Sequence, residues 1–270
     1  GIGDAGFHRH CWYERAFTLR RGAGRTILHF GAVDYMARVR VNQQLVAEHE
    51  GGHTPFCADI TSALRTDGRQ TVTVHAEDDP HDLAKARGKQ GWLSEPHGVW
   101  YPRTSGIWQP VWIEQVGATY IKSLRWTPVF DNYEIGCEVS TCGEECSDLF
   151  VEVKIWHKGK LLADDNYKLV GNEANRKIAL SDPGIDDSRN ELLWSPERPT
   201  LLDAEITLHH RGTVLDRVTS YTALRSVNIT RDRFMLNGRS YPLRLVLDQG
   251  YWPETLMTPP GGDALRRDVM

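Results

Sequence analysis

The sequence of 270 residues lacks the features that mark membrane-spanning, nucleic-acid-binding and disulfide-stapled proteins. No stretch approaches the roughly 18 consecutive apolar residues of a membrane-spanning helix. The chain has 32 basic and 36 acidic residues, and the net charge of -4 favours neither nucleic acid nor an anionic membrane as a partner. The N-terminus shows neither a signal-peptide pattern nor an initiator methionine, which predicts an internal segment and leaves the compartment open.

Cysteine is scarce, and its spacing is unlike that of a metal site. Of the five cysteines, Cys137, Cys142 and Cys146 lie close together, but they form no C-x-x-C pair and have no fourth ligand nearby. A zinc site, a disulfide and free thiols are the alternatives, and we favour free thiols. Since the chain also lacks a Walker loop and a G-x-S-x-G elbow, we expect no metal and no cofactor.

Short alternating segments separated by turns dominate the first 116 residues. The regular spacing of these segments predicts a β-sandwich over residues 1–116, because no segment with helical periodicity lies between them. The exception is residues 79–110, a long loop rich in tryptophan, glycine, proline and charge, and such loops are often functional or docked onto a neighbour. The clearest strand patterns are residues 12–19, 25–30, 37–41, 70–76 and 111–116.

A second block of about the same length repeats this rhythm and predicts an immunoglobulin-like sandwich over residues 117–222. The paired cysteines and central tryptophan of antibody domains are absent from it. Its clearest strand patterns are residues 134–140, 149–156, 176–180 and 204–209.

The last 48 residues, 223–270, change character. Asn237-Gly238 predicts a tight hairpin turn, because both residues tolerate positive φ. The apolar stretch Tyr241–Leu247 predicts a strand buried on both faces, and residues 263–270 predict a helix. Strand, polar loop and helix together indicate the first βα unit of a truncated parallel α/β domain. Because a lone parallel strand leaves its hydrogen bonds unmade, we expect residues 240–270 to be poorly packed or unusually docked.

Aromatic and polar side chains crowd the long loop together, in the mixture that binds carbohydrate: rings stack on sugar C–H surfaces while charged and amide groups bond hydroxyls. The alternative, which we weigh equally, is that the rings pack the loop onto its own sandwich or a neighbour. The residues concerned are Trp92, Trp100, Tyr101, Trp108, Arg87, Lys89, Gln90, His97 and Arg103.

Several stretches, in order along nearly the whole chain, resemble glycoside hydrolase family 2, which includes β-galactosidases, β-glucuronidases and β-mannosidases. The resemblance implies a jelly-roll-like sugar-binding sandwich, an immunoglobulin-like sandwich and the first strand of a (β/α)8 barrel. The stretches are Trp12-Tyr-Glu-Arg-Ala-Phe17, Phe30-Gly-Ala-Val-Asp-Tyr35, Val39-Arg-Val-Asn42, His49-Glu-Gly-Gly-His-Thr-Pro-Phe56, Thr104-Ser-Gly-Ile-Trp-Gln109, Leu193-Trp-Ser-Pro-Glu-Arg-Pro199 and Phe234-Met-Leu-Asn-Gly238.

The resemblance also implies an activity that this chain alone does not carry. The family's two catalytic glutamates lie on later barrel strands, beyond residue 270, so no catalytic residue is expected here. The intact enzyme would hydrolyse O-glycosidic bonds of oligosaccharides or glycoconjugates by a retaining mechanism without a cofactor. Its partners would be carbohydrate substrate and, in the full-length enzyme, further copies of itself, with no nucleic acid or membrane.

Residues that touch substrate in the intact enzyme are expected in two places. Barrel sites form at the carboxyl ends of strands, and the loop of the first sandwich reaches over the pocket in the resembling family. In the better-known galactosidases the first barrel strand leads to a histidine that touches substrate, and Gln249 stands there, which puts galactose specificity in doubt. The expected substrate-binding residues are Asp248, Gln249, Tyr251, Trp252, Trp100, Arg103 and His97.

Two other classes of function stay open at this point. One is a carbohydrate-binding or scaffold module without hydrolase activity, which this chain alone would resemble. The other is a metal-dependent or nucleotide-dependent enzyme, which would hold a metal ion or cofactor when purified.

Overall fold

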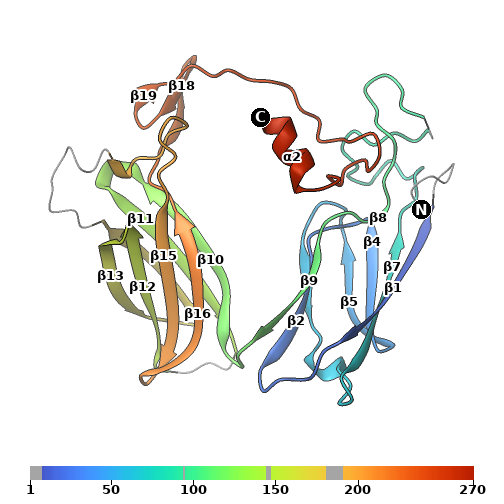
Figure 1. Ribbon diagram of the computed structural model, residues 1–270, viewed down its shortest axis with the longest axis horizontal. Coiled ribbons are helices and arrows are strands. Elements are labelled where there is room, and N and C mark those ends of the chain that lie inside the picture. Colours follow the sequence, from blue (N-terminus) through green and yellow to red (C-terminus); the bar gives the residue numbers. More distant parts are fainter. Residues whose placement is uncertain (1–7, 94, 144–146, 181–190) are drawn as a thin grey trace. The chain divides into compact units, whose positions relative to one another are not determined.

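The protein is described from a computed structural model over residues 8–93, 95–143, 147–180 and 191–270. The chain forms two compact units, one of Gly1–Gln115 with Leu247–Met270 and the other of Val116–Val246. Strands dominate both units (Figure 1), as the alternating sequence patterns predict. The first unit therefore joins two segments that lie far apart in the sequence.

The first unit contains a sandwich of two sheets with strand orders β1-β7-β4-β5 and β6-β2-β9, and a short ribbon of β3 and β8. All five strand patterns expected before residue 117 form strands, so the β-sandwich is confirmed. The bounds are β1 His10–Thr18, β2 Arg25–Phe30, β3 Val33–Asp34, β4 Met36–Val41, β5 Gln44–Glu50, β6 Phe56–Asp59, β7 Arg69–Glu77, β8 Gly106–Ile107 and β9 Val111–Val116, with a 3₁₀ turn η1 at Thr61–Ala63.

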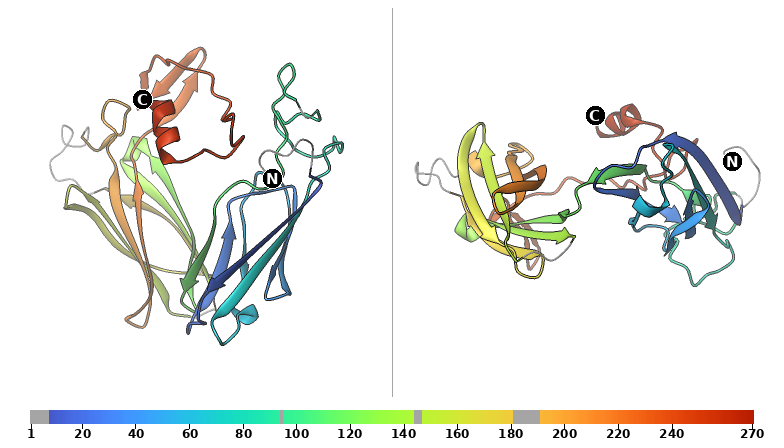
Figure 2. Two further views of the ribbon diagram at one scale, coloured as in Figure 1. Left: turned by 45° about the vertical axis from the view of Figure 1, so that its right-hand side comes forward. Right: turned by 90° about the horizontal axis from the view of Figure 1, so that it is seen from below.

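Strand β4 shows how the alternation builds this core. Ala37, Val39 and Val41 are fully buried, while Arg38 and Arg40 between them point to the other face. Successive side chains of a strand point to opposite faces, so the pattern M-A-R-V-R-V gives one apolar and one polar face. Figure 2 shows the two layers of strands from further directions.

The second unit is a sandwich of a three-stranded sheet, β10-β11-β14, and a four-stranded sheet, β13-β12-β15-β16. This arrangement fits the immunoglobulin-like sandwich predicted from the sequence, and all four expected strands form. The core between the sheets is apolar, with Val153, Ile155, Ile206 and Leu208 fully buried. The bounds are β10 Tyr120–Val129, β11 Glu134–Cys142, β12 Leu149–His157, β13 Lys160–Lys168, β14 Glu173–Ala179, β15 Leu202–His210 and β16 Thr213–Thr222, with a 3₁₀ turn η2 at Phe130–Asn132.

A small three-stranded meander follows, formed by β17 Val227–Thr230, β18 Arg233–Leu236 and β19 Arg239–Ser240. The predicted turn joins β18 to β19, with φ of 50° at Asn237 and 72° at Gly238. The Asn237 side chain also donates from Nδ2 to the carbonyl of Trp194 over 3.0 Å and accepts the Ser226 N–H. The asparagine therefore shapes the turn and ties the meander to the segment before β15.

The strand expected over Tyr241–Leu247 does not form, although the structure describes this segment throughout. Its apolar side chains are open to solvent, with exposed fractions of 79% at Leu245, 93% at Val246 and 87% at Leu247. A parallel strand is stable only when neighbours satisfy its N–H and C=O groups, and no described strand lies beside this one. The expectation that this stretch would be poorly packed is confirmed.

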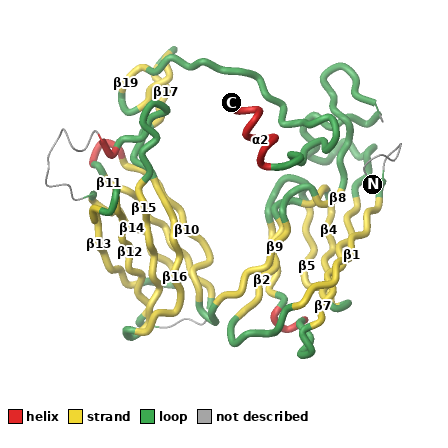
Figure 3. The backbone as a smooth tube through the Cα atoms, viewed as in Figure 1, coloured by secondary structure: helices red, strands yellow, loops and turns green. Residues whose placement is uncertain are grey.

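Residues after 247 consist of turns followed by the helix α2, Gly262–Val269, which confirms the helix expected at 263–270. Figure 3 shows the long loop connections around this helix. Ala264 is its only buried residue, so most of the helix surface is exposed. The described part of the chain contains no helix that is both long and apolar enough to cross a membrane.

Candidate functional site

The long loop between β7 and β8, residues 78–105, is fastened to the sandwich by a buried amide–carboxylate pair. Gln90, which is fully buried, donates from Nε2 to Oδ2 of Asp34 over 2.9 Å and accepts the Thr104 N–H at Oε1 over 2.9 Å. Burial raises the pKa of Asp34, and the hydrogen bond from Gln90 partly opposes that rise. The middle of the loop is thereby tied to a core carboxylate and to the loop's own C-terminal end.

A second buried carboxylate holds the base of the loop. Arg103 donates from Nε to Oδ2 of Asp78 over 2.9 Å and from Nη2 to Oδ1 over 2.6 Å. Ser105 donates to the same carboxylate over 3.1 Å, and Lys85 Nζ lies 3.6 Å from it. This bidentate geometry is the strongest form of the arginine–carboxylate pair. It commits most of the Arg103 donors to the loop itself.

The tip of the loop is an aromatic cluster around one arginine. The Arg87 guanidinium lies over the rings of both Trp92 and Trp100, 5.2 Å from each ring centre. The two indole rings are 5.4 Å apart, and His97 meets Trp92 edge-on at 5.3 Å. Gly91 permits this crowding, because a Cβ there would lie 3.2 Å from His97, Trp100 and the Tyr101 carbonyl.

Residues 251–258 dock onto the same region of the first unit. The Tyr251 ring stacks on Tyr101 with 4.1 Å between the ring centres and 9° between the planes. Thr258 donates from Oγ1 to the carbonyl of Trp108 over 2.9 Å, while the Trp108 indole donates to Gly52 over 2.7 Å. Burial and the nearby charge of Asp34 raise the pKa of Tyr251. The docked segment therefore sits directly against the loop and its anchor.

The structure places four of the predicted site residues at the loop tip and on the docked segment, whereas Asp248 and Arg103 make hydrogen bonds within the fold. Trp100 and His97 lie at the loop tip, and Tyr251 and Trp252 lie on the docked segment, where Trp252 exchanges two backbone hydrogen bonds with Leu256. Asp248 is exposed and accepts the Gly250 N–H at Oδ1 over 2.8 Å, closing a tight turn beside the half-buried Gln249. Arg103 is only 9% exposed and is held by Asp78.

Asp34 and Asp78 were not among the expected site residues, although both accept hydrogen bonds that hold the loop in place. Asp34 lies inside the stretch Phe30-Gly-Ala-Val-Asp-Tyr35, in which an acidic residue ends an otherwise apolar run. Asp78 follows directly after β7. A carboxylate embedded in apolar sequence is a signal for a buried polar pair, because an isolated buried charge is too costly to persist.

Unpartnered buried polar atoms gather at this site. Those in the described residues are Nη1 of Arg87, Nε2 of His97, Nη1 of Arg103, Oγ1 of Thr104, Oγ1 of Thr255 and both ring nitrogens of His157. Apart from His157, all belong to the long loop or the docked segment. Buried polar groups are normally paired, so these atoms are open to an external partner, either ordered water or a ligand.

An apolar hollow of the first unit lies elsewhere. It opens between the edge strands β1 and β9, has a volume of about 490 Å³, and is lined chiefly by apolar core side chains such as Phe17, Phe30, Val74 and Ile113. Sugar hydroxyls need hydrogen-bonding groups, and most residues that line this hollow are aliphatic or phenylalanine side chains, which offer none. The loop cluster is the better candidate for a sugar site.

Two family models match the chain. The glycosyl hydrolase 2 galactose-binding domain-like model matches residues 6–109, and the glycosyl hydrolases family 2 model matches residues 119–225. The chain belongs to glycoside hydrolase family 2. The first match covers the first sandwich up to strand β9, together with the loop that carries the aromatic cluster. The second match covers the immunoglobulin-like sandwich.

Individual family 2 relatives agree with this assignment. The chain is 27% identical to a β-galactosidase of Thermoanaerobacter pseudethanolicus over 86% of this chain and 31% of the relative. It is 28% identical to the β-glucuronidase of Canis lupus familiaris over 85% of this chain and 37% of the relative. The chain therefore spans about a third of the length of the curated relatives it matches.

Solved structures share the fold. The crystal structure of a Bacteroides uniformis β-glucuronidase superposes with a TM-score of 0.75 at 24% identity, covering 97% of this chain and 32% of that one. A β-glycosidase from Bacteroides vulgatus gives a TM-score of 0.71 at 19% identity, covering 94% of this chain and 31% of that one.

Cysteines and other metal-ligating side chains form no site in the part of the chain that the structure describes. Cys11, Cys57, Cys137 and Cys142 are free thiols, and Cys146 lies outside the described residues. Cys137 and Cys142 form no disulfide with each other in this structure. Among the described residues no group of three or more His, Cys, Asp or Glu is placed to hold a metal ion.

Proposed function

We propose that this chain forms the non-catalytic N-terminal part of a retaining β-glycosidase that hydrolyses O-glycosidic bonds in oligosaccharides or glycoconjugates. The observation that carries the proposal is the family membership of both sandwiches, since the relatives are glycosidases about three times longer than the matched part. In this proposal the two catalytic glutamates lie beyond residue 270. One protonates the leaving oxygen and the other forms the glycosyl-enzyme.

The carboxylates at the candidate site support a non-catalytic role for this part. A retaining glycosidase needs two carboxyl groups about 5 to 5.5 Å apart that both reach the substrate. Asp34 and Asp78 are 2% and 1% exposed, and each is already bound by loop side chains. Neither is free to attack a sugar or to protonate a leaving group.

In the same proposal, the docked segment and the loop tip line part of the substrate pocket. Asp248, Gln249, Tyr251 and Trp252 would face the sugar from the segment that leads into the barrel. Trp100 and His97 would face it from the loop. Arg103 would position the loop through Asp78 rather than reach the substrate with its own donors, since most of them are engaged.

The test compares this chain with the longer protein that contains it, on a panel of aryl β-glycosides. We expect turnover by the longer protein and none by residues 1–270 alone. Hydrolysis by the isolated chain would overturn the argument that the catalytic carboxylates lie elsewhere. Sugar binding by both proteins with hydrolysis by neither would favour the second candidate, a carbohydrate-binding module, for which the aromatic loop cluster is the supporting observation.

A further inference from the structure

Arg87 is a cation that the fold holds in place without giving it a counter-ion. Its guanidinium lies 5.2 Å from both the Trp92 and Trp100 ring centres. Within the described part of the chain this side chain has no hydrogen-bond or ion-pair partner, and its Nη1 is buried and unpartnered. A guanidinium carries five N–H donors, so a strong acceptor site is left open.

The contrast with Arg103 on the same loop is sharp. Arg103 donates from Nε and Nη2 to Asp78 in a bidentate pair and is nearly buried. Glu95, the acidic residue near the loop tip, offers its backbone carbonyl to His97 and forms no ion pair with Arg87 among the described residues. The fold therefore pairs one loop arginine with a carboxylate and leaves the other stacked on two indole rings.

His97 adds a second unmet group beside Trp92. Its Nδ1 lies 3.2 Å from the Glu95 carbonyl oxygen, which can only accept, so Nδ1 carries the hydrogen in that bond. In the neutral ring, Nε2 is then an acceptor, and it is buried without a partner. His97 and Arg87 contact the same indole ring, and an acceptor and a set of cationic donors placed in this way suit a ligand that carries both a hydroxyl and an oxyanion.

We propose that Arg87, with His97 and the Trp100 ring, forms a subsite for an acidic saccharide at the loop end of the pocket, resting on the proposed function. The guanidinium takes the oxyanion, a carboxylate or a sulfate ester, in the forked geometry that arginine gives such groups. The His97 Nε2 accepts a neighbouring hydroxyl. Because Arg87 Nη1 is shielded, the ligand displaces the Trp92 ring, which is already 37% exposed.

The experiment measures binding to this chain by isothermal titration calorimetry, with three probes of matched length. They are an oligogalacturonide, a sulfated galacto-oligosaccharide and the neutral galacto-oligosaccharide. We expect the acidic probes to bind at least about tenfold more tightly than the neutral one, since a charge-assisted bidentate pair contributes an energy of that order. Comparison of the carboxylated and sulfated probes shows which oxyanion the site takes.

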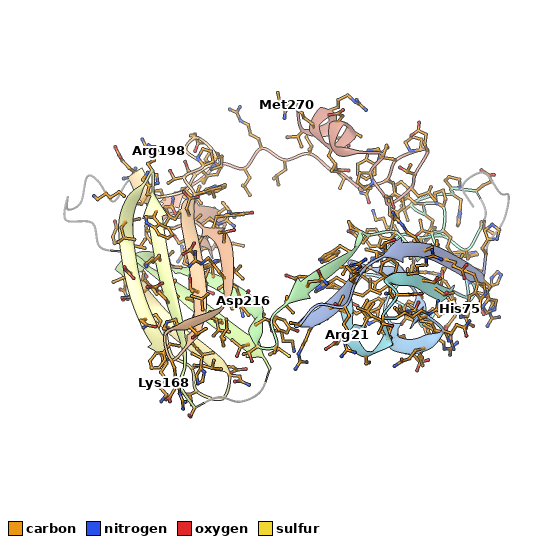
Figure 4. All side chains as sticks on the ribbon, turned by 60° about the horizontal axis from the view of Figure 1, so that its bottom comes forward. Arg21, His75, Lys168, Arg198, Asp216 and Met270 are labelled. Atoms are coloured by element: carbon orange, nitrogen blue, oxygen red, sulfur yellow. The ribbon has the colours of Figure 1, made fainter. Side chains whose placement is uncertain are left out.

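Matched variants separate a specific site from bulk charge. Arg87→Gln should lose the preference for acidic probes, and Arg87→Lys should retain part of it, because lysine keeps the charge without the fork. Arg21→Gln makes the same charge change at an exposed position outside the loop (Figure 4), and should bind as the unchanged chain does. Near-ultraviolet circular dichroism should change on binding as Trp92 moves.

The proposal is overturned if the acidic and neutral probes bind alike, if no acidic probe binds, or if Arg21→Gln and Arg87→Gln weaken binding equally. Intact near-ultraviolet spectra of the ligand-free variants show that the loop remains folded, and Arg87→Lys decides the question if Arg87→Gln does not fold. This test needs no turnover. Its failure leaves the hydrolase proposal standing, and the absence of hydrolysis by the longer protein would leave this site standing.

Discussion

Gln90 and Asp34 meet through a single hydrogen bond of 2.9 Å between two side chains that are almost entirely shielded from solvent. The pair joins the long loop to strand β3, 56 residues earlier in the chain. Gln90 also accepts the Thr104 N–H near the far end of the loop. One amide side chain thus fixes the path of the segment that presents the aromatic cluster.

Replacement of Gln90 by alanine should destabilise the first unit by about 2 kcal/mol, because it leaves the Asp34 carboxylate and the Thr104 N–H buried without partners. Urea unfolding followed by tryptophan fluorescence measures the loss. Gln44→Ala, at an exposed position of β5, is the matched control and should change the free energy of unfolding by less than about 0.5 kcal/mol. Equal stability of the two variants would show that Gln90 does not anchor the loop.

The pH dependence of stability should report the burial of Asp34. Its folded pKa is raised above the ordinary value of 3.8, so the folded chain holds this proton to a higher pH than the unfolded chain does. The contribution of Asp34 to the free energy of unfolding is therefore most favourable below pH 3.8 and becomes less favourable as the pH rises through the folded pKa.

Asp34→Asn isolates this effect, since the asparagine Oδ1 can still accept from Gln90 and carries no charge. Relative to the unchanged chain, the variant should gain stability as the pH rises above 3.8, until the folded Asp34 is fully ionised. The lowered pKa values of Asp59 and Asp79 act in the opposite direction, but they are common to both proteins and cancel in the difference. A difference that is constant with pH would contradict the prediction.

Stacking between Tyr101 and Tyr251 should hold the docked segment in place. Tyr101→Ala removes a contact of 4.1 Å between the ring centres, and an aromatic pair of this kind contributes about 0.5–1.5 kcal/mol beyond its buried area. Hydrogen exchange should then quicken at the backbone amides of Trp252 and Leu256, which bond each other. Tyr221→Ala, at a 65% exposed tyrosine of β16, should leave these amides unchanged. Unaltered exchange in Tyr101→Ala would show that other contacts dock the segment.

Most of both sandwiches could be predicted from the sequence, because apolar residues occupy every second position along strands such as β4 and β12. The strands that sequence patterns did not predict include β13 and β16, whose sequences K-L-L-A-D-D-N-Y-K and T-V-L-D-R-V-T-S-Y-T are rich in polar residues. Both lie at the edges of their sheet, where one side has no neighbour and apolar alternation is not required. The strand predicted over Tyr241–Leu247 failed for the opposite reason, since its apolar pattern requires neighbours on both sides.

The candidate site could be predicted only as a region. The crowding of tryptophans marked the loop. Only the ion pairs formed in the folded chain decide which arginine is buried against a carboxylate and which lies against the indole rings. Asp78 follows β7 directly and captures Arg103 from a distance of 25 residues, which leaves Arg87 to the indole rings. No local pattern distinguishes these two arginines.

Cysteine reactivity should divide the thiols by burial. Burial raises the pKa of Cys137 to about 12, so almost none of it is thiolate near neutral pH. Cys57 is exposed on β6 and should react rapidly with a thiol reagent at pH 8, whereas Cys137 should react only after unfolding. Mass spectrometry of peptides from the labelled native chain measures the extent of labelling at Cys57 and at Cys137, with the urea-unfolded chain as the control. Rapid native labelling of Cys137 would show that the core of the second unit opens readily.

The last prediction concerns Gln249, which we propose faces the sugar from the docked segment. In the longer protein, Gln249→Ala should lower kcat/KM. The fall should correspond to a loss of about 1–3 kcal/mol of transition-state stabilisation, as expected when a buried hydrogen bond to a polar partner is removed. Asp248→Ala should have an effect of similar size, but part of it would come from the turn that Asp248 closes with Gly250. Gln44→Ala, an exposed residue of β5, supplies the control for an amide removed away from the site.

A packing role for Gln249 would give a different set of measurements. The side chain is half-buried in this chain, so its removal could loosen the docked segment without touching the sugar. Unchanged kcat/KM with a lowered Tm would assign Gln249 to packing, whereas lowered kcat/KM with an unchanged Tm would assign it to the substrate. If both fall, the Tyr101→Ala variant provides the reference, because it loosens the same segment while leaving the Gln249 amide in place. A loss of kcat/KM in Gln249→Ala beyond that of Tyr101→Ala then belongs to the amide itself.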